Sequence, residues 1–300
     1  MGKGRAQAGA CHNRGGGMTD FDLRYISLGA GVQSTALYLM AVEGEITPMP
    51  DFAVFADTQS EPKHVYTHLE WLRDTFGHII PIETTTKGSL RQMIVDAATL
   101  ENAPRLASVP FWSTGEDGRE APGMRQCTDE MKISVLRKHV REKLGLAKGE
   151  RAAGKYRVEC WIGISVDEVT RAKPSRESWI ENRFPLLYDV PMRRGDCLDW
   201  MQERGYPEPG RSACTFCPYR SMPEWREMRE KDPESFEDAC QVDEVIRVNG
   251  PLRSGSARMR NLQYVHRSLR PLREVIDDPD WDETRQTNMF EAECSGMCGV

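Results

Sequence analysis

The chain has 300 residues and a formal net charge of −6 at pH 7. This length can bury a large core, and the net negative charge argues against a protein whose whole surface binds nucleic acid. No apolar run approaches the roughly 20 residues of a membrane-spanning helix, and residues 1–17 lack an apolar signal core. We therefore expect a cytoplasmic protein without a membrane partner, in which residues 1–20 form a disordered leader.

The first predicted element is a short apolar strand that begins at Tyr25 and runs into a turn with two glycines. Residues 33–42 then have the pattern of an amphipathic helix. Glycines let backbone N–H groups approach an anion, hydroxyl side chains add donors, and a helix N-terminus carries partial positive charge. The turn therefore predicts a phosphate site, although a tight turn without a ligand is the alternative. We assign to this site Ser27, Gly29, Ala30, Gly31, Gln33, Ser34 and Thr35.

A second apolar strand, residues 52–56, ends at Asp57 and Thr58, and a helix is predicted over residues 64–76. Open α/β sheets bind ligands at the carboxyl ends of their strands. Asp57 and Thr58 are therefore candidates for a ligand site at this edge. The alternative is that they cap the following helix.

Strand and helix patterns continue to alternate along the chain. They predict a strand over 78–82, a helix over 89–98, an irregular stretch over 102–126, a helix over 128–144 and a strand over 158–164. This order predicts an α/β fold with a doubly wound, mostly parallel sheet. We place this domain at residues 21–190, followed by a helical, cysteine-bearing region and a mobile tail at residues 191–300.

The strand that ends near residue 164 delivers charged side chains to the same sheet edge. Asp167 and Glu168 could hold Mg²⁺ there, and Arg171 could bind a phosphate or sulfate. Helix capping and a surface ion pair are the alternative. Arg125 and Arg211 are further candidates for contacts with an anion, as is Lys132.

Nine cysteines in a chain without a secretory signal should mostly be reduced, which indicates metal or redox chemistry. Cys214-Thr215-Phe216-Cys217-Pro218 places two thiols in one tight turn, where they can bind a metal ion or a cluster. One pair cannot complete such a site, so further thiols are needed. The candidates are Cys127, Cys294 and Cys298. The remaining cysteines are interpreted as packing residues or as residues without a role in the site, and they are Cys11, Cys160, Cys197 and Cys240.

Residues 245–273 contain many arginines and no acidic residue. Such a run can bind the phosphates of a nucleic acid, and a solvated loop without a ligand is the alternative. The arginines are Arg247, Arg253, Arg258, Arg260, Arg267, Arg270 and Arg273.

The glycine turn resembles the PP-loop of ATP pyrophosphatases and phosphoadenylylsulfate (PAPS) reductases, which reads Ser-Gly-Gly-x-Asp-Ser. Here it is Gly29-Ala30-Gly31-Val32-Gln33-Ser34, so glutamine replaces the aspartate. Asp57-Thr58-Gln59 resembles the family's Asp-Thr-Gly turn, and Gly163 to Arg171 resembles its Gly-x-Arg-x-Asp-Glu-x-x-Arg turn. The resemblance implies an adenine nucleotide alpha hydrolase-like fold that binds ATP or another adenine nucleotide and Mg²⁺, with Asp57, Thr58 and Lys132 near the nucleotide.

Iron-sulfur members of this family bind a 4Fe-4S cluster through two cysteine motifs. The first is a Cys-Cys pair just before a helix, with a lysine a few residues further on, and the second is a distant CxxC motif. Gln126 replaces the first cysteine of the pair, so the resemblance implies three ligands and an open iron, as in cluster-dependent tRNA thiolation enzymes. The ligands are Cys127, Cys214 and Cys217, and Zn²⁺ is the alternative metal. The tail around Cys294 and Cys298 resembles the terminal Glu-Cys-Gly-Leu/Ile-His motif, whose cysteine attacks sulfur. Cys294 is therefore either a fourth metal ligand or, like Cys298, a sulfur carrier.

These motifs imply an ATP-dependent thiolation enzyme. ATP would adenylate a carbonyl oxygen of the acceptor, and sulfur from the open iron or a tail persulfide would displace AMP. Asp167, Arg171, Cys294 and Cys298 are the candidate catalytic residues. The expected partners are a sulfur donor protein, a nucleic-acid acceptor bound by residues 247–273, and a second copy of the chain in a homo-oligomer. The alternatives are a reductase of adenylated sulfate and a non-catalytic protein that binds nucleotide or zinc.

Overall fold

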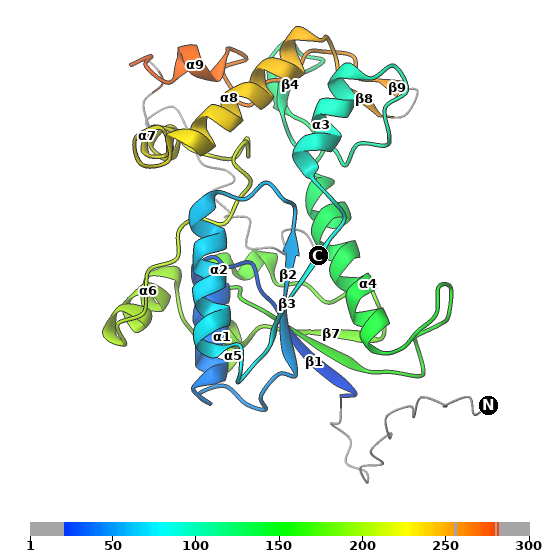
Figure 1. Cartoon of the computed structure of the whole chain (residues 1–300), viewed down its shortest axis with the longest axis vertical. Helices are drawn as coiled ribbons and strands as arrows, with labels where there is room; N and C mark the ends of the chain where they lie inside the picture. Colours follow the sequence, from blue (N-terminus) through cyan, green and yellow to red (C-terminus); the bar gives the residue numbers. More distant parts are fainter. Residues whose placement is uncertain (1–20, 255–256, 280, 282–300) are drawn as a thin grey trace, which may run out of the picture.

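The centre of the molecule is a five-stranded parallel sheet (Figure 1). The computed structural model describes residues 21–254, 257–279 and 281. The strand order is β3-β2-β1-β6-β7, so β1 is central and the chain changes direction beside it. Ligands bind at such a switch point in open α/β sheets. The strands are β1 Leu23–Ser27, β2 Phe52–Asp57, β3 Ile82–Thr86, β6 Val158–Ile162 and β7 Ile180–Arg183.

Helices cover both faces of this sheet, which confirms the predicted doubly wound α/β fold. Alternate residues of each strand face opposite sides. Ile26 and Trp161 pack against α1, α2 and α6, whereas Tyr25 and Ile162 pack on the α4 side. Figure 1 shows α1, α2 and α6 on one side of the strands and α4 on the other. The helices of this part are α1 Val32–Val42, α2 Lys63–Phe76, α4 Ser134–Lys143, α5 Pro185–Tyr188 and α6 Arg194–Glu203.

A second layer lies beyond the carboxyl ends of the central strands (Figure 1). Its core combines side chains from two stretches of chain, such as Ile94 and Phe111 from the first and Trp225 and Ile246 from the second. This layer therefore covers the edge of the sheet where a ligand is expected. Its elements are α3 Leu90–Thr99, β4 Trp112–Thr114, β5 Glu120–Pro122, α7 Met222–Lys231, α8 Pro233–Val248, β8 Arg253–Ser254, β9 Ala257–Arg258 and α9 Leu272–Val275.

Three predicted elements differ from the structure. The helix expected to be amphipathic, α1, is buried over residues 32–41, because it is enclosed between the sheet and α6. The strand expected at 78–82 is β3, Ile82–Thr86, since residues 77–81 form the turn that ends α2. The helix expected from residue 128 begins with a π-helical segment, Asp129–Ile133, before α4.

The stretch expected to be irregular, residues 102–126, contains the β4–β5 hairpin. Trp112 and Tyr264 exchange two backbone hydrogen bonds of 2.8 Å, which join this hairpin to the arginine-rich stretch. The buried carboxylate of Asp243 holds the same stretch, because it accepts hydrogen bonds from the backbone N–H groups of Val265 at 2.9 Å and Leu272 at 3.0 Å. Residues 257–273 are therefore built into the second layer.

Several arginines of this stretch form ion pairs with carboxylates. The pairs are Arg247 with Asp243, Arg260 with Glu116, Arg267 with Glu120, Arg270 with Asp278, and Arg273 with Glu237. Much of the positive charge is thus balanced within the fold. A nucleic-acid acceptor on this surface stays a prediction. Within the described residues, no helix is both long enough and apolar enough to cross a membrane.

Candidate nucleotide and thiol site

The glycine turn connects the end of β1 to the N-terminus of α1. Gly31 is the residue before the helix, and no side chain caps the first turn. The first N–H groups of a helix have no partner within the helix, and the aligned peptide dipoles favour an anion at this end. The end of α1 therefore has the features of a phosphate site.

The two hydroxyl groups expected to bind phosphate are used inside the protein. The Ser34 hydroxyl accepts a hydrogen bond from the backbone N–H of Gly29 and donates one to the carbonyl of Gly31, both at 3.2 Å. The Thr35 hydroxyl lies 3.2 Å from Nε2 of His68 on α2. Both side chains therefore fix the shape of the turn, and backbone N–H groups are the donors that the turn offers to a ligand. Ser27 is buried at the end of β1.

Two residues at this edge have a left-handed backbone, which favours glycine. Ala30 has φ 57° and Gln59 has φ 55°. Each occupies a position where the resembled family has glycine, and each costs on the order of 1–2 kcal/mol as an L-residue. The Asp57 carboxylate stabilises the second turn, because it accepts hydrogen bonds from the backbone N–H of Gln59 at 2.7 Å and the Tyr66 hydroxyl at 2.9 Å. Strain of this kind is typical of ligand sites.

The end of β6 packs directly on the first turn of α1. A Cβ atom on Gly163 would lie 2.7 Å from the backbone nitrogen of Ser34, so only glycine fits at this position. Beyond it, the Gln33 amide donates hydrogen bonds of 3.3 Å to the Ser165 hydroxyl and to the Glu168 carboxylate. The structure thus brings the residues after β6 against the glycine turn.

The carboxylates expected to hold Mg²⁺ already have partners. Glu168 forms an ion pair with Arg171 and accepts the hydrogen bond from Gln33. Asp167 accepts a hydrogen bond of 3.3 Å from the backbone N–H of Arg194 at the start of α6. The described part of the chain has no group of three or more His, Cys, Asp or Glu residues arranged to hold a metal ion. These residues, as they are arranged here, do not fit a Mg²⁺ site.

The cysteine turn is attached to the same sheet edge by hydrogen bonds. The Ser212 hydroxyl donates to the carbonyl of Gly29 in the glycine turn. The backbone N–H of Thr215 donates to the carbonyl of Ser60 at 2.8 Å. The Thr58 hydroxyl lies 3.5 Å from the sulfur of Cys214. Residues 214–217 therefore lie over the ends of β1 and β2.

Cys127, Cys214 and Cys217 line one pocket together with Lys132. The Lys132 ammonium lies 3.1 Å from the Glu61 carboxylate, and the two side chains are 5% and 0% exposed. Burial raises the pKa of the Cys214 thiol well above its usual value, and the Glu61 carboxylate raises it further, whereas the Lys132 ammonium lowers it. Cys214 is therefore a protonated thiol at neutral pH.

Thiolates of cysteine are the ligands that iron-sulfur clusters and many zinc sites require, and Cys127, Cys214 and Cys217 could supply three of them. The pocket that they line has a volume of about 30 Å³, which is room for about one water molecule. As arranged, the site does not fit a four-iron cluster. The cluster and the zinc alternative both stay predictions, and Cys294 and Cys298 lie outside the described residues. The buried positions of Cys160, Cys197 and Cys240 agree with their expected packing role.

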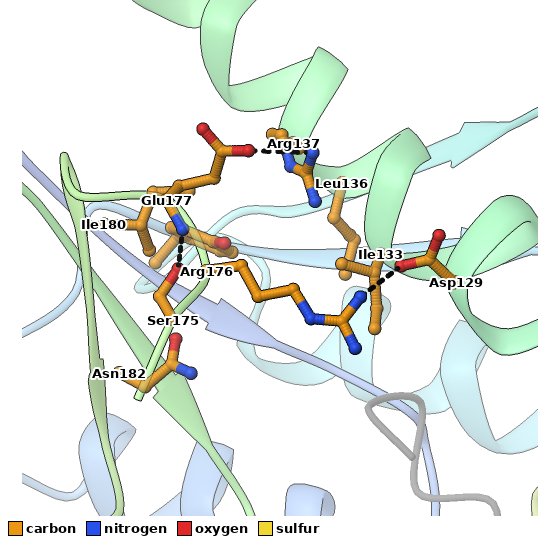
Figure 2. Close-up of a pocket in the computed structure, with 10 residues that line it drawn as sticks. Asp129, Ile133, Leu136, Arg137, Ser175, Arg176, Glu177, Ile180 and Asn182 are labelled. Carbon is orange, nitrogen blue, oxygen red and sulfur yellow. Dashed lines mark hydrogen bonds and ion pairs between the residues drawn. The ribbon is translucent and has the colours of Figure 1, made fainter. Parts of the chain in front are cut away.

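A separate pocket lies between α4 and the segment before β7 (Figure 2). Arg137 pairs with Glu177 at 2.9 Å, and Arg176 pairs with Asp129 at 3.8 Å. These four charged side chains are therefore already paired with one another. The pocket lies on the α4 face of the sheet, away from the glycine turn, so we do not assign it to the candidate site.

Sequence reasoning missed several residues that shape this edge. Ser212 and Thr215 attach the cysteine turn, His68 holds the first turn of α1, and Gly163 lets β6 approach the helix. The signal for Gly163 was present, because a glycine at the end of a buried strand indicates close approach of another segment. The other contacts join distant parts of the chain, and no local pattern marks them.

No protein-family model matches this chain, and a search of curated proteins finds no relative. The matches among solved structures include the crystal structure of phosphoadenylyl-sulfate (PAPS) reductase from Candida auris in its phosphate complex. That match has 11% sequence identity and a TM-score of 0.41, and it covers 65% of this chain and 81% of the other. A likeness at this level carries no argument about function.

Proposed function

We propose that this chain binds an adenine nucleotide at the glycine turn and uses it for sulfur transfer to an acceptor carbonyl. One observation carries the proposal. The Ser212 hydroxyl, two residues before Cys214, donates to the carbonyl of Gly29 in the glycine turn. A helix N-terminus suited to phosphate and a turn with two thiols are therefore adjacent at one edge of the sheet.

The proposed chemistry has two steps. In the first, the carbonyl oxygen of the acceptor bonds to the α-phosphorus of ATP, and pyrophosphate leaves. In the second, hydrosulfide attacks the activated carbon, and AMP leaves with the former carbonyl oxygen. The N–H groups at the start of α1 would orient the phosphates. The thiols of Cys127, Cys214 and Cys217 would position the hydrosulfide for this attack.

The experiment measures both steps in anaerobically purified protein. Exchange of labelled pyrophosphate into ATP reports adenylation, and thiolated product formed with hydrosulfide reports sulfur transfer, with tRNA, DNA and small carbonyl compounds as acceptors. Cys214→Ala should retain exchange and lose thiolated product. Cys240→Ala is the matched control, because Cys240 is buried within α8 and does not line the pocket, and it should retain both activities.

Two outcomes would contradict this proposal. Reduction of an adenylated sulfate by the protein, without any ATP-dependent exchange, would indicate the reductase. A protein that binds nucleotide or zinc and supports neither reaction would indicate a non-catalytic role. Iron, sulfide and zinc analysis of the same samples tests the metal prediction separately, because a metal held by Cys127, Cys214 and Cys217 would be lost when any one of the three is replaced.

A further inference from the structure

The cysteine turn, residues 214–217, has the backbone hydrogen bond of a β-turn. The N–H of Cys217 donates to the carbonyl of Cys214 at 3.0 Å, so the two cysteines are the first and fourth residues of the turn. The Cα atoms at these positions lie less than about 7 Å apart, and cysteines joined by a disulfide have Cα atoms roughly 4.4–6.8 Å apart. The backbone therefore holds the two cysteines at a separation that a disulfide can span.

The two side chains also line the same pocket, whose volume of about 30 Å³ leaves little space between its walls. Both residues are partly exposed, so a small oxidant can reach the pair, whereas Cys160, Cys197 and Cys240 are buried. Cys127 lines the pocket as well, but it comes from another segment of the chain. Cys214 and Cys217 thus combine a shared pocket with a turn that brings their backbones together.

Contacts with neighbouring segments hold the turn in this conformation. Thr215 donates from its backbone N–H to the carbonyl of Ser60 at 2.8 Å and from its hydroxyl to the carboxylate of Asp238 at 2.6 Å. Phe216 is fully buried in the core of the second layer. Because the turn is already fixed, little conformational entropy remains to be lost when the two sulfur atoms bond.

We propose that Cys214 and Cys217 are a redox-active pair that exchanges with small organic disulfides and forms a reversible disulfide within the turn. One cysteine thiolate attacks a sulfur of the small disulfide, so that a mixed disulfide forms and one small thiolate leaves. The second cysteine attacks the protein sulfur of this mixed disulfide, and the second small thiolate leaves. The two protein thiols are oxidised, their protons pass to the two released thiols, and the small disulfide is reduced.

This pairing agrees with the poor fit of the pocket to a four-iron cluster, because a disulfide needs no space beyond that of its two sulfur atoms. The disulfide leaves neither sulfur as a free thiol in the pocket. Oxidation should therefore stop the sulfur transfer proposed above, and this consequence alone rests on the proposed function. Formation of the disulfide is measured without reference to any activity.

The test is peptide mapping of the whole chain, which is equilibrated at different ratios of reduced to oxidised glutathione and then alkylated. Trypsin cleaves after arginine and lysine, so peptide 212–220 contains both cysteines of the turn and peptide 126–132 contains Cys127. As the oxidised fraction rises, peptide 212–220 without alkyl groups, and lighter by two hydrogen atoms, should replace the doubly alkylated peptide. Dithiothreitol should reverse this change. Cys240 should be alkylated only after unfolding, because it is buried.

Two cysteine variants give a matched comparison. Cys217→Ser should lose the disulfide, and Cys197→Ser, at a buried position in α6, should retain it in full. No disulfide within peptide 212–220 at excess oxidised glutathione, or one that joins Cys214 to any other cysteine, would overturn the proposal. A disulfide in protein that still forms thiolated product would support the redox pair and contradict the proposed role of Cys214 in sulfur transfer. The two proposals therefore fail separately.

Discussion

Replacing Lys132 by methionine is expected to lower the free energy of unfolding by about 3–5 kcal/mol. Lys132 and Glu61 form a buried ion pair beside the thiol pocket, and their side chains are 5% and 0% exposed. The second carboxylate oxygen of Glu61 has no hydrogen-bond partner within the described residues, so the pair depends on the ammonium. Methionine would fill the space of the lysine stem and leave a buried carboxylate without its cation.

The double variant Lys132→Met, Glu61→Gln removes both charges and is expected to recover most of this loss. Urea unfolding of the wild type, both single variants and the double variant gives the coupling free energy. If the two losses simply add in the double variant, the side chains do not act as a pair. A single Lys132→Met variant as stable as the wild type would contradict their burial.

Gly163→Ala should destabilise the protein by about 1–3 kcal/mol and weaken adenine nucleotide binding together with it. The new Cβ would lie 2.7 Å from the nitrogen and 2.8 Å from the Cα of Ser34. Both are backbone atoms at the start of α1, so the helix N-terminus must move. Because the proposed phosphate site is this N-terminus, stability and nucleotide affinity should fall in the same variant.

Gly195→Ala is the matched control, because a Cβ on Gly195 meets nothing within 4 Å. Gly195 lies near the start of α6, where alanine is about as stable as glycine or better by 0.5–1 kcal/mol. Thermal unfolding and nucleotide titration of both variants test the claim. Equal behaviour of the two alanine variants would show that β6 does not constrain the glycine turn.

The parts of the fold that the sequence predicted well have strong local patterns. β1, β2 and β6 are buried on both faces, so their apolar runs are visible without any knowledge of the rest of the chain. β3 was misplaced because it is an edge strand with alternating exposure, and its threonines give no apolar run. α1 was predicted to be amphipathic, but its side chains from Val32 to Ala41 are all buried, the polar ones of the first turn included.

The candidate site was predicted as separate motifs, and the structure shows which of them meet. Glycine, cysteine and charge patterns are local and were found. The orientation of a hydroxyl is not local, and so the contacts of Ser34 and Thr35 were not predicted. The same holds for Asp167, which accepts a hydrogen bond from the backbone N–H of Arg194 because the start of α6 lies beside it. Tertiary packing decides such contacts.

Calorimetric titration of ATP into the wild type and Gly31→Val tests the central claim most directly. Gly31 has φ −96° and ψ −179°, which valine can adopt, and a Cβ there would lie 3.5 Å from the Cβ of Ser212, an ordinary contact. The variant should therefore fold, while its methyl groups occupy the space at the helix N-terminus. We predict that the wild type binds ATP and that folded Gly31→Val shows no measurable binding. Unchanged affinity in folded Gly31→Val would contradict a nucleotide site at this turn.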